Sequence, residues 1–565
     1  MRKTGTWGIV GALLVTTLAG CMGGGGNGNE GGGAASEPAG SEPAKTGAAA
    51  KEETVNEFGW KVPAETLEIN FYAGQDNPDK VAENSKMIQE FLLEKFNVKL
   101  NKIVYDVDMN EKLNLMLASG DYPEVITGLN EEQAAKWIAQ GKAVELSQYI
   151  DEHAPNVKSQ LGDIYKSFFR ADGKLYMLPS YWGLLPIPGA SAHIRNDYWT
   201  EMGQPSIDTP EKFYEVLKQM QAAHPTNSNG EPTYALSGYA PMYSRVVPTL
   251  AGMWGLKGGY KIADDGTNTH WANTDEGLAL TLYMNQFYRD GLLDPDSFIN
   301  TFDDMKAKFS AERVMGYIGS WWITWNVGHE VWQKTDPNWT DDKRFLNVAV
   351  KADTAEKAYM TGLDARGTYR TIITDKAEHP EAIMKWFNFS ITDIGTRIIG
   401  WGVPNAEQSV WTYENGKIGW VEEMKQAIVD GTYDFTNSDL VGQGVMTLVE
   451  GIGTMKDDGK STYWFDQNFN DEAKWKKIMN ENMKDTIYDN TFGIINIPGN
   501  DPLAVTNTQV LEQLETLWAK AVTAGTAEES EQFFYEMREK LNAAGLQQIE
   551  AYRTKEYQRR LAEWQ

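Results

Sequence analysis

The chain has 565 residues and a formal net charge of −27, and 41% of its residues are hydrophobic. We expect no nucleic-acid partner, because binding nucleic acid requires a basic surface. Cys21 is the only cysteine, so the rest of the chain has no disulfide, thiolate metal site or cysteine nucleophile. Because the chain has six histidines and no H-E-x-x-H pattern, we expect no bound metal and no catalytic zinc.

The first twenty residues have the features of a secretory signal peptide. Arg2 and Lys3 are followed by a mostly apolar segment at residues 7–18 and by small residues immediately before Cys21. A spanning helix needs about 20 apolar residues, which favours cleavage over retention in a bilayer. We therefore expect residues 1–20 to be removed.

The next segment is expected to be a flexible tether. Residues 23–54 contain no Val, Ile, Leu, Phe, Trp or Tyr, so they cannot bury enough apolar surface to offset their conformational entropy. We assign residues 21–58 to a tether rich in Gly, Ala, Ser and Glu. Chain statistics for about 33 residues of such a composition, counted from Met22, give a root-mean-square span of roughly 30 Å.

Strands and helices alternate at the start of the body. Residues 67–72 alternate like a strand, and residues 74–78 form a turn. The elements expected next are a helix at 80–96, a strand at 98–104, a helix at 109–119 and a strand at 124–127. This order predicts an α/β body in which helices cover a sheet.

Further helices have clear end signals. A helix at 210–223 begins with Thr209 as N-cap, and a helix at 274–290 ends before Gly291. Other helical patterns occur at 378–391, 506–524 and 528–563. A body of this length is expected to divide into two lobes.

Several segments occur in an order that one protein family shares. They are LMLASGDYPEV at 115–125, ADGKLYMLP at 171–179, IRNDYW at 194–199, FYRDGLLDP at 287–295, GYIGSW at 316–321, and the C-terminal helix pattern at 550–564. In this order the chain resembles the family 1 extracellular solute-binding proteins of ATP-driven importers, especially the long lipoproteins of Gram-positive bacteria.

The sequence before the tether supports the same resemblance. Residues 18–21, Leu-Ala-Gly-Cys, resemble the lipobox of bacterial lipoproteins, in which the cysteine is linked to diacylglycerol and becomes the first residue. The resemblance thus implies lipidation of Cys21, with acyl chains such as palmitate, and attachment to the outer face of the cell membrane. The alternative is a plain secretory signal with a chance cysteine.

The resemblance implies an α/β, two-lobed periplasmic-binding-protein-like fold (type II). Lobe 1 is expected at residues 59–182 and 362–400, and lobe 2 at residues 183–361 and 401–565. The expected crossings between the lobes are residues 179–188, 362–371 and 400–405. Ligand would lie between the lobes, which close about these hinges.

One departure from the family concerns calcium. Many long members have a calcium loop of the form DPDGNGKKDE after the helix that begins Thr-Pro-Glu. Here residues 224–233 read HPTNSNGEPT, so the leading acid is His224 and most later acids are absent. We expect a turn without calcium, and no cofactor.

Aromatic residues are the main candidates for contacts with ligand. Sugars stack their C–H faces on aromatic rings, while polar side chains bind their hydroxyl groups. The candidates are Trp321 and Trp322 in a Gly-rich segment, Tyr181 and Trp182 at the first crossing, and Trp401 at the third. Core packing is the alternative for each, since most tryptophans lie in the core or its rim.

Polar candidates follow predicted strands and crossings. Gln75 and Asp76 follow the first strand, Asp121 lies in a Ser-Gly-Asp turn, and Arg366 follows the second crossing. Arg366 has a planar fork that suits the carboxylate of a uronic acid. For Asp121 the alternative is a cap on the local turn.

The sequence therefore predicts a lipid-anchored, monomeric binding protein rather than an enzyme. It would capture an oligosaccharide between its lobes and deliver it to the permease of an ABC transporter. One alternative is a binding protein for peptides or lipid-like solutes. Another is a surface glycan hydrolase or lyase; hydrolysis would require paired carboxylates about 5–10 Å apart.

Overall fold

A computed structural model describes residues 54–73, 86–103, 109–170, 173–180, 190–340, 342–361, 369–429 and 501–564, together with residues 433, 477–478, 481, 487–489, 495 and 497. The signal peptide, Cys21 and most of the predicted tether lie outside these residues. Among the described helices, none is both long and apolar enough to span a bilayer.

The first sheet has five strands among the described residues, in the order β2-β1-β3-β12-β4. They are β1 (Leu67–Ala73), β2 (Val98–Ile103), β3 (Val125–Leu129), β4 (Leu178–Ser180) and β12 (Tyr369–Ile373). β1 pairs in parallel with β2 and β3, whereas β12 runs antiparallel to β3 and β4.

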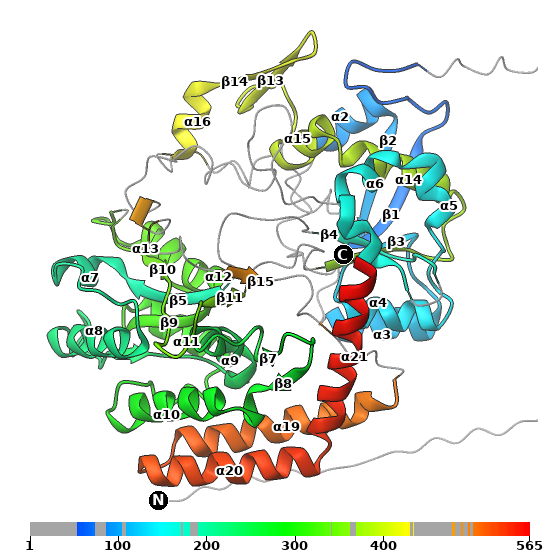
Figure 1. Ribbon diagram of the computed structural model, residues 1–565. Coiled ribbons are helices and arrows are strands. Elements are labelled where there is room, and N and C mark those ends of the chain that lie inside the picture. Colours follow the sequence, from blue (N-terminus) through cyan, green and yellow to red (C-terminus); the bar gives the residue numbers. More distant parts are fainter. Residues whose placement is uncertain are drawn as a thin grey trace, which may run out of the picture. The chain divides into compact units, whose positions relative to one another are not determined.

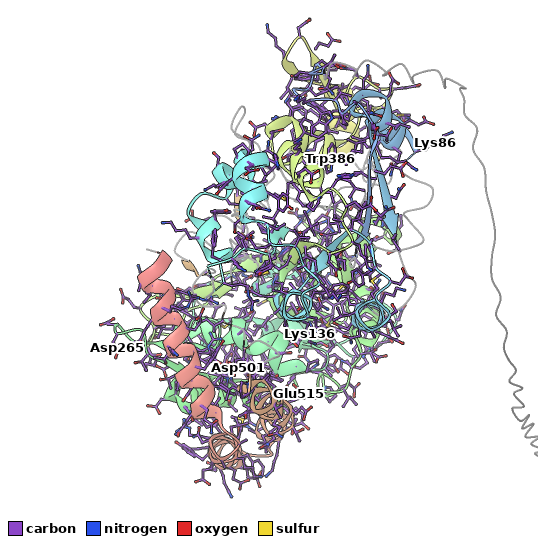
Figure 2. All side chains as sticks on the ribbon, turned by 90° about the vertical axis from the view of Figure 1, so that its right-hand side faces the viewer. Lys86, Lys136, Asp265, Trp386, Asp501 and Glu515 are labelled. Carbon is purple, nitrogen blue, oxygen red and sulfur yellow. The ribbon has the colours of Figure 1, made fainter. Side chains whose placement is uncertain are left out.

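Alternating side chains bury both faces of this sheet. Ile69, Phe71 and Ala73 enter one apolar cluster, while Tyr72, between Phe71 and Ala73, enters another. The first cluster is completed by α2 (Lys86–Phe96), α5 (Ser147–His153), α6 (Pro155–Leu161), α14 (Pro380–Ser390) and α15 (Asp393–Trp401). The second is completed by α3 (Met109–Ser119) and α4 (Glu131–Ala139). Trp386 of α14, labelled in Figure 2, is only 1% exposed.

The second sheet has the order β15-β11-β5-β9-β6, with β10 paired to β5. The strands are β5 (Ala190–Arg195), β6 (Tyr234–Leu236), β9 (Val314–Ser320), β10 (Phe345–Val348), β11 (Tyr359–Thr361) and β15 (Ile487–Asp489). The helices between them are α7 (Asn196–Glu201), α8 (Pro210–Ala223), α9 (Met242–Met253), α10 (Asp275–Arg289), α11 (Phe302–Ser310), α12 (Trp321–Thr324) and α13 (Glu330–Thr335).

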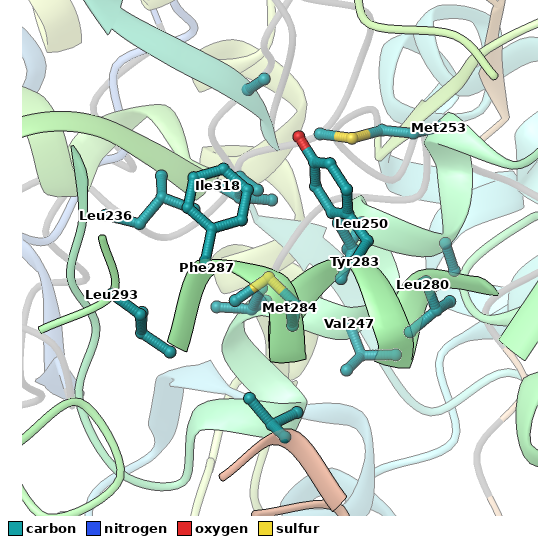
Figure 3. Packing of buried hydrophobic residues seen from close by; sticks show 14 of the residues in the cluster. Leu236, Val247, Leu250, Met253, Leu280, Tyr283, Met284, Phe287, Leu293 and Ile318 are labelled. Atoms are coloured by element: carbon teal, nitrogen blue, oxygen red, sulfur yellow. The ribbon is translucent and has the colours of Figure 1, made fainter. Parts of the chain in front are cut away.

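The core beside this sheet is built largely on α10. Figure 3 shows Tyr283, Met284 and Phe287 of α10 among side chains of α9 and of strands β6 and β9. Three C-terminal helices extend this core: α19 (Leu503–Val522), α20 (Ala527–Ala543) and α21 (Leu546–Trp564). α10 packs against α19 and α20, which run beside each other in Figure 1. The two sheets, each with its own core, confirm the α/β, two-lobed type II fold.

Side-chain caps explain why the helix starts were predictable. Thr209 accepts a hydrogen bond from the Lys212 backbone at the start of α8, and Thr274 does the same from Gly277 for α10. The single helical pattern at 528–563 is corrected, because Gly545 ends α20 with a φ of 110°. A Cβ atom there would lie 2.5 Å from the Thr506 side chain, so only glycine fits.

The chain changes sheets at two of the predicted places. It passes from the first sheet to the second between β4 and β5, and returns between β11 and β12. The third predicted crossing, at residues 400–405, is corrected. Trp401, Val410 and Trp411 all belong to the core cluster of the first sheet, and Tyr433 packs against it. Residues 401–429 and Tyr433 therefore stay with lobe 1.

The boundary at the tether also changes. Phe58 is 8% exposed and stacks on Phe96, and the Asn56 side chain donates to the Lys95 carbonyl. The predicted tether of residues 21–58 is therefore too long at its C-terminal end. Apolar residues return at Val55, and the buried ring of Phe58 fixes the chain to the first core.

Candidate functional site

At one edge of the second sheet, the chain arrives from the first sheet and later returns to it. β5 begins at Ala190, which pairs with Ser320 at the end of β9 and with Thr361 at the end of β11. β5 is preceded by the segment from β4, and β11 is followed by the segment to β12. We call this the crossing edge. Strand ends at such switches of topology are favoured places for small-ligand sites.

Trp321 and Trp322 begin α12 immediately beyond the crossing edge. Ile323 is 1% exposed and Val327 is fully buried, and both pack in a cluster with Tyr317 and Phe309. Trp322 is 40% exposed and Trp321 is half-buried. The first turn of α12 thus turns its aliphatic side inward and its Trp322 indole toward solvent.

A glycine fixes this turn of the chain. Gly319 has a φ of 150°, and a Cβ atom on it would lie 2.7 Å from the Tyr317 hydroxyl. Such a contact is too short for any side chain. The Gly319-Ser320 step, recognised in the sequence as part of a Gly-rich segment, therefore determines where the two tryptophans start.

Three aromatic rings from different elements form a row beside α12. The Trp322 ring lies 6.0 Å from the Phe302 ring, which lies 5.4 Å from Tyr239. Tyr239 follows β6, and Phe302 is the first residue of α11. We call Tyr239, Phe302 and Trp322 the aromatic row. The row runs from the exposed Trp322 through the half-buried Phe302 to Tyr239, which is buried at 6% exposure.

A buried polar network holds the turn that carries Tyr239. The Asn300 side chain donates to the Gly238 carbonyl at 3.0 Å and to Asp294 at 3.0 Å. Asp294 also accepts from Ser237 at 2.7 Å and from Lys308 at 2.8 Å. Burial lowers the pKa of Lys308, but its contacts with Asp294 and its neighbouring acid outweigh this and raise the pKa overall. The Asp-Pro motif of the sequence thus serves to position the β6 turn.

A neutral histidine lies under the crossing edge. The His193 ring nitrogen Nε2 is 3.0 Å from the Gly319 carbonyl, and the ring is 1% exposed. Burial lowers the pKa of His193 to about 4, against a smaller opposing effect of this hydrogen bond. His193 is therefore uncharged at neutral pH and contributes hydrogen bonding rather than charge.

The structure places only some of the predicted contact residues. Gln75, Asp76, Tyr181, Trp182 and Arg366 lie outside the described residues. Their assignment to the ligand site stays a prediction.

The structure does not bring Asp121 together with the crossing edge. Asp121 precedes the start of β3, beside the end of β12, whereas the chain enters β12 at the other end of β3. Its backbone N–H donates to the Ser119 hydroxyl, and its side chain is exposed. Asp121 therefore lies in the predicted Ser-Gly-Asp turn, where the Ser119 hydroxyl accepts its backbone N–H.

Trp401 also takes its alternative role. It is 3% exposed in the core of the first sheet, with its ring 4.6 Å from Trp420. The Arg397 guanidinium lies 4.9 Å from the centre of the same ring. An indole covered in this way is part of the core, the alternative that the sequence left open for Trp401.

Sequence reasoning missed Tyr239 and Phe302. Each follows a recognisable signal: Tyr239 comes after a Ser-Gly step at a strand end, and Phe302 follows the N-cap Thr301. Helical periodicity does not force a large apolar residue in the first turn of a helix into the core. The position of Phe302 at the start of α11 was therefore the signal that could have marked it as a candidate for exposure. The contact between the two rings depends on tertiary structure.

The loop at residues 224–233 has no oxygen set ready for a cation. The Asn227 side-chain oxygen accepts backbone N–H groups from Asn229 and Glu231. The Glu231 carboxylate is taken by the Asn227 amide and lies 3.7 Å from Arg313. These residues therefore do not fit calcium. Elsewhere in the described part of the chain, no group of three or more acidic, histidine or cysteine side chains is arranged to hold a metal.

Comparison with known families decides the class of the protein. The model of the bacterial extracellular solute-binding proteins matches residues 79–396. The chain belongs to this family. This solute-binding protein is 23% identical over 363 residues to the fructooligosaccharide ABC transporter substrate-binding protein FusA of Streptococcus pneumoniae, covering 61% of this chain and 63% of that one. It is 24% identical over 249 residues to the lipoprotein LipO of Bacillus subtilis, covering 39% and 43% of the two chains.

A solved structure shows the same fold. It is an EF-hand mutant of the S. pneumoniae substrate-binding protein FusA in complex with fructo-nystose, with a TM-score of 0.63 and 17% identity. The superposition covers 88% of this solute-binding protein and 99% of that chain. The matched regions in the two relatives span less than two thirds of their length, so their ligands do not transfer automatically to this protein.

Proposed function

We propose that this solute-binding protein captures an oligosaccharide outside the cell and delivers it to the permease of an ABC importer. The aromatic row is the observation that carries the proposal. Its rings come from the ends of separate elements beside the crossing edge, and the Trp322 indole is open to solvent. Stacked sugar faces match a partly exposed series of rings better than an extended peptide backbone does. The name of one relative, a fructooligosaccharide-binding protein, supports the same class of ligand.

We also propose that the protein acts as a monomer attached to the cell membrane through lipid on Cys21. The lipobox-like residues before Cys21 and the name of the relative LipO as a lipoprotein support this attachment. Two acyl chains are enough for stable anchoring, whereas a single chain gives only marginal binding. The tether would confine the binding protein near its importer and raise the rate of encounter.

Binding and release require no bond chemistry in this proposal. Ligand favours a closed arrangement of the two lobes over an open one, and its differential affinity shifts the population between them. We therefore propose no enzymatic activity. Cleavage of covalent bonds within the ligand during incubation with the protein would contradict this proposal.

The test is binding of an oligosaccharide panel, measured by calorimetry and by tryptophan fluorescence. The Trp322→Ala variant should weaken binding of its best oligosaccharide by about tenfold, because an aromatic stacking contact is worth about 0.5–1.5 kcal/mol beyond buried area. Tyr535→Ala is the matched control, since Tyr535 is 43% exposed on α20, outside the aromatic row. Equal losses in both variants, or binding of peptides alone, would refute the proposal.

A further inference from the structure

A cationic side chain lies at one end of the aromatic row. Arg245 is exposed in the first turn of α9, and its guanidinium carbon lies 4.9 Å from the centre of the Tyr239 ring. The row continues from Tyr239 through Phe302 to Trp322 at 5.4 and 6.0 Å between ring centres. A guanidinium and an exposed indole thus occupy the two ends of one continuous series.

The donors of Arg245 are not used within the described part of the protein. No described side chain or carbonyl forms a hydrogen bond or ion pair with its guanidinium. Other arginines of this lobe are paired. Arg195 contacts Asp197 and Glu312, and Arg313 donates to the Pro232 carbonyl at 2.9 Å.

The local helix geometry makes Arg245 unfavourable as a purely structural cation. A positive side chain in the first turn adds to the positive end of the helix dipole. The free N–H groups at this helix start are already bound by Glu515 of α19, labelled in Figure 2, which accepts from Met242 at 3.0 Å and Tyr243 at 3.3 Å. Arg245 therefore remains the group at this end with donors available for an anion.

We infer that the bound oligosaccharide carries carboxylate groups and that Arg245 binds one of them. This inference rests on the proposed function and names its ligand class, a uronic acid oligosaccharide. The planar guanidinium matches a carboxylate with two parallel hydrogen bonds, while sugar rings stack on Phe302 and Trp322. The net charge of −27 repels an anionic ligand, so a local cation is needed to offset that repulsion.

The experiment uses a panel of uronic acid trisaccharides, each paired with a counterpart whose carboxyl groups are reduced to alcohols. Calorimetry is done with the wild-type chain and with Arg245→Gln, Arg245→Lys and Arg289→Gln. Arg289 is an exposed arginine on α10, whose side chain donates to Asn285, so its variant controls for loss of one positive charge.

The wild-type chain should bind at least one acidic trisaccharide more tightly than its reduced counterpart. Arg245→Gln should weaken the acidic ligand by about 10- to 100-fold, the range expected for a charge-assisted hydrogen-bonded pair, and leave the reduced ligand within about twofold. Arg245→Lys should recover part of the loss, because lysine restores charge without the planar fork. Arg289→Gln should match the wild type.

The outcomes separate this inference from the proposed function. Preference for neutral oligosaccharides, or equal weakening of acidic and reduced ligands in Arg245→Gln, overturns the carboxylate assignment and leaves oligosaccharide binding in place. Absence of binding to every oligosaccharide, acidic or neutral, overturns both. Thermal unfolding of each variant identifies any loss that arises from misfolding instead of from the site.

Discussion

Replacing Asp294 by Asn should destabilise the second lobe and loosen the aromatic row. The Asp294 side chain is fully buried and accepts from Ser237, Asn300 and Lys308, of which Lys308 is 12% exposed. An asparagine of the same shape must turn its NH2 group toward some of these donors, whichever way the amide lies. Buried donors then lose their acceptor, and the charge on Lys308 loses its best partner.

The size of the effect follows from what Lys308 keeps. Breaking a buried ion pair costs about 3–5 kcal/mol when the remaining charge has no other partner. Lys308 retains Asp296 at 2.9 Å and the Asn300 oxygen at 3.1 Å. We therefore expect a loss of about 3 kcal/mol in the free energy of unfolding, at the lower end of that range.

Urea denaturation followed by tryptophan fluorescence measures this loss. Asp296→Asn is the matched control, because it removes the neighbouring carboxylate, which is 54% exposed, and should cost less than about 1 kcal/mol. Oligosaccharide affinity should fall in Asp294→Asn alone, since Asn300 joins Asp294 to the Gly238 carbonyl next to Tyr239. A loss below about 1 kcal/mol with an unchanged m-value would refute the network as the support of this turn.

Two further predictions concern pH and attachment. His270 is buried, its Nδ1 accepts the Ala272 N–H, and burial with a nearby Arg553 charge lowers its pKa to about 3. The unfolded chain binds this proton more readily, so stability should fall as the pH drops from about 6.5 toward 3, and His270→Asn should flatten the thermal-unfolding profile across that window. Cys21→Ala should release the protein from cell membranes into the medium without changing its ligand affinity in solution. Immunoblots of the two fractions together with calorimetry test this, and reduced affinity would show that anchor and binding site are not independent.

The elements that the sequence predicted well are those whose signals act over a few residues. The start of α8 follows from one side chain bonded to a backbone N–H three residues later, and β1 follows from alternation within seven residues. The two-lobed fold could be predicted because the motifs shared with the family are spread along the chain. Such signals need no knowledge of distant contacts. The predicted helix at 210–223 therefore has the same first and last residues as α8, Pro210–Ala223.

The binding surface depended on tertiary structure. Trp322 was correctly expected beside a strand end, but its neighbours Tyr239 and Phe302 come from separate segments and meet only after β6 and β9 pair. Trp401 lies between two glycines, and Trp322 lies in a Gly-rich segment. Trp401 nevertheless became core, because Trp411 and Trp420 of the hairpin formed by β13 (Trp411–Glu414) and β14 (Lys417–Trp420) pack against it. Local sequence determined which tryptophans sit at turns, whereas burial by distant segments determined which of them solvent and ligand can reach.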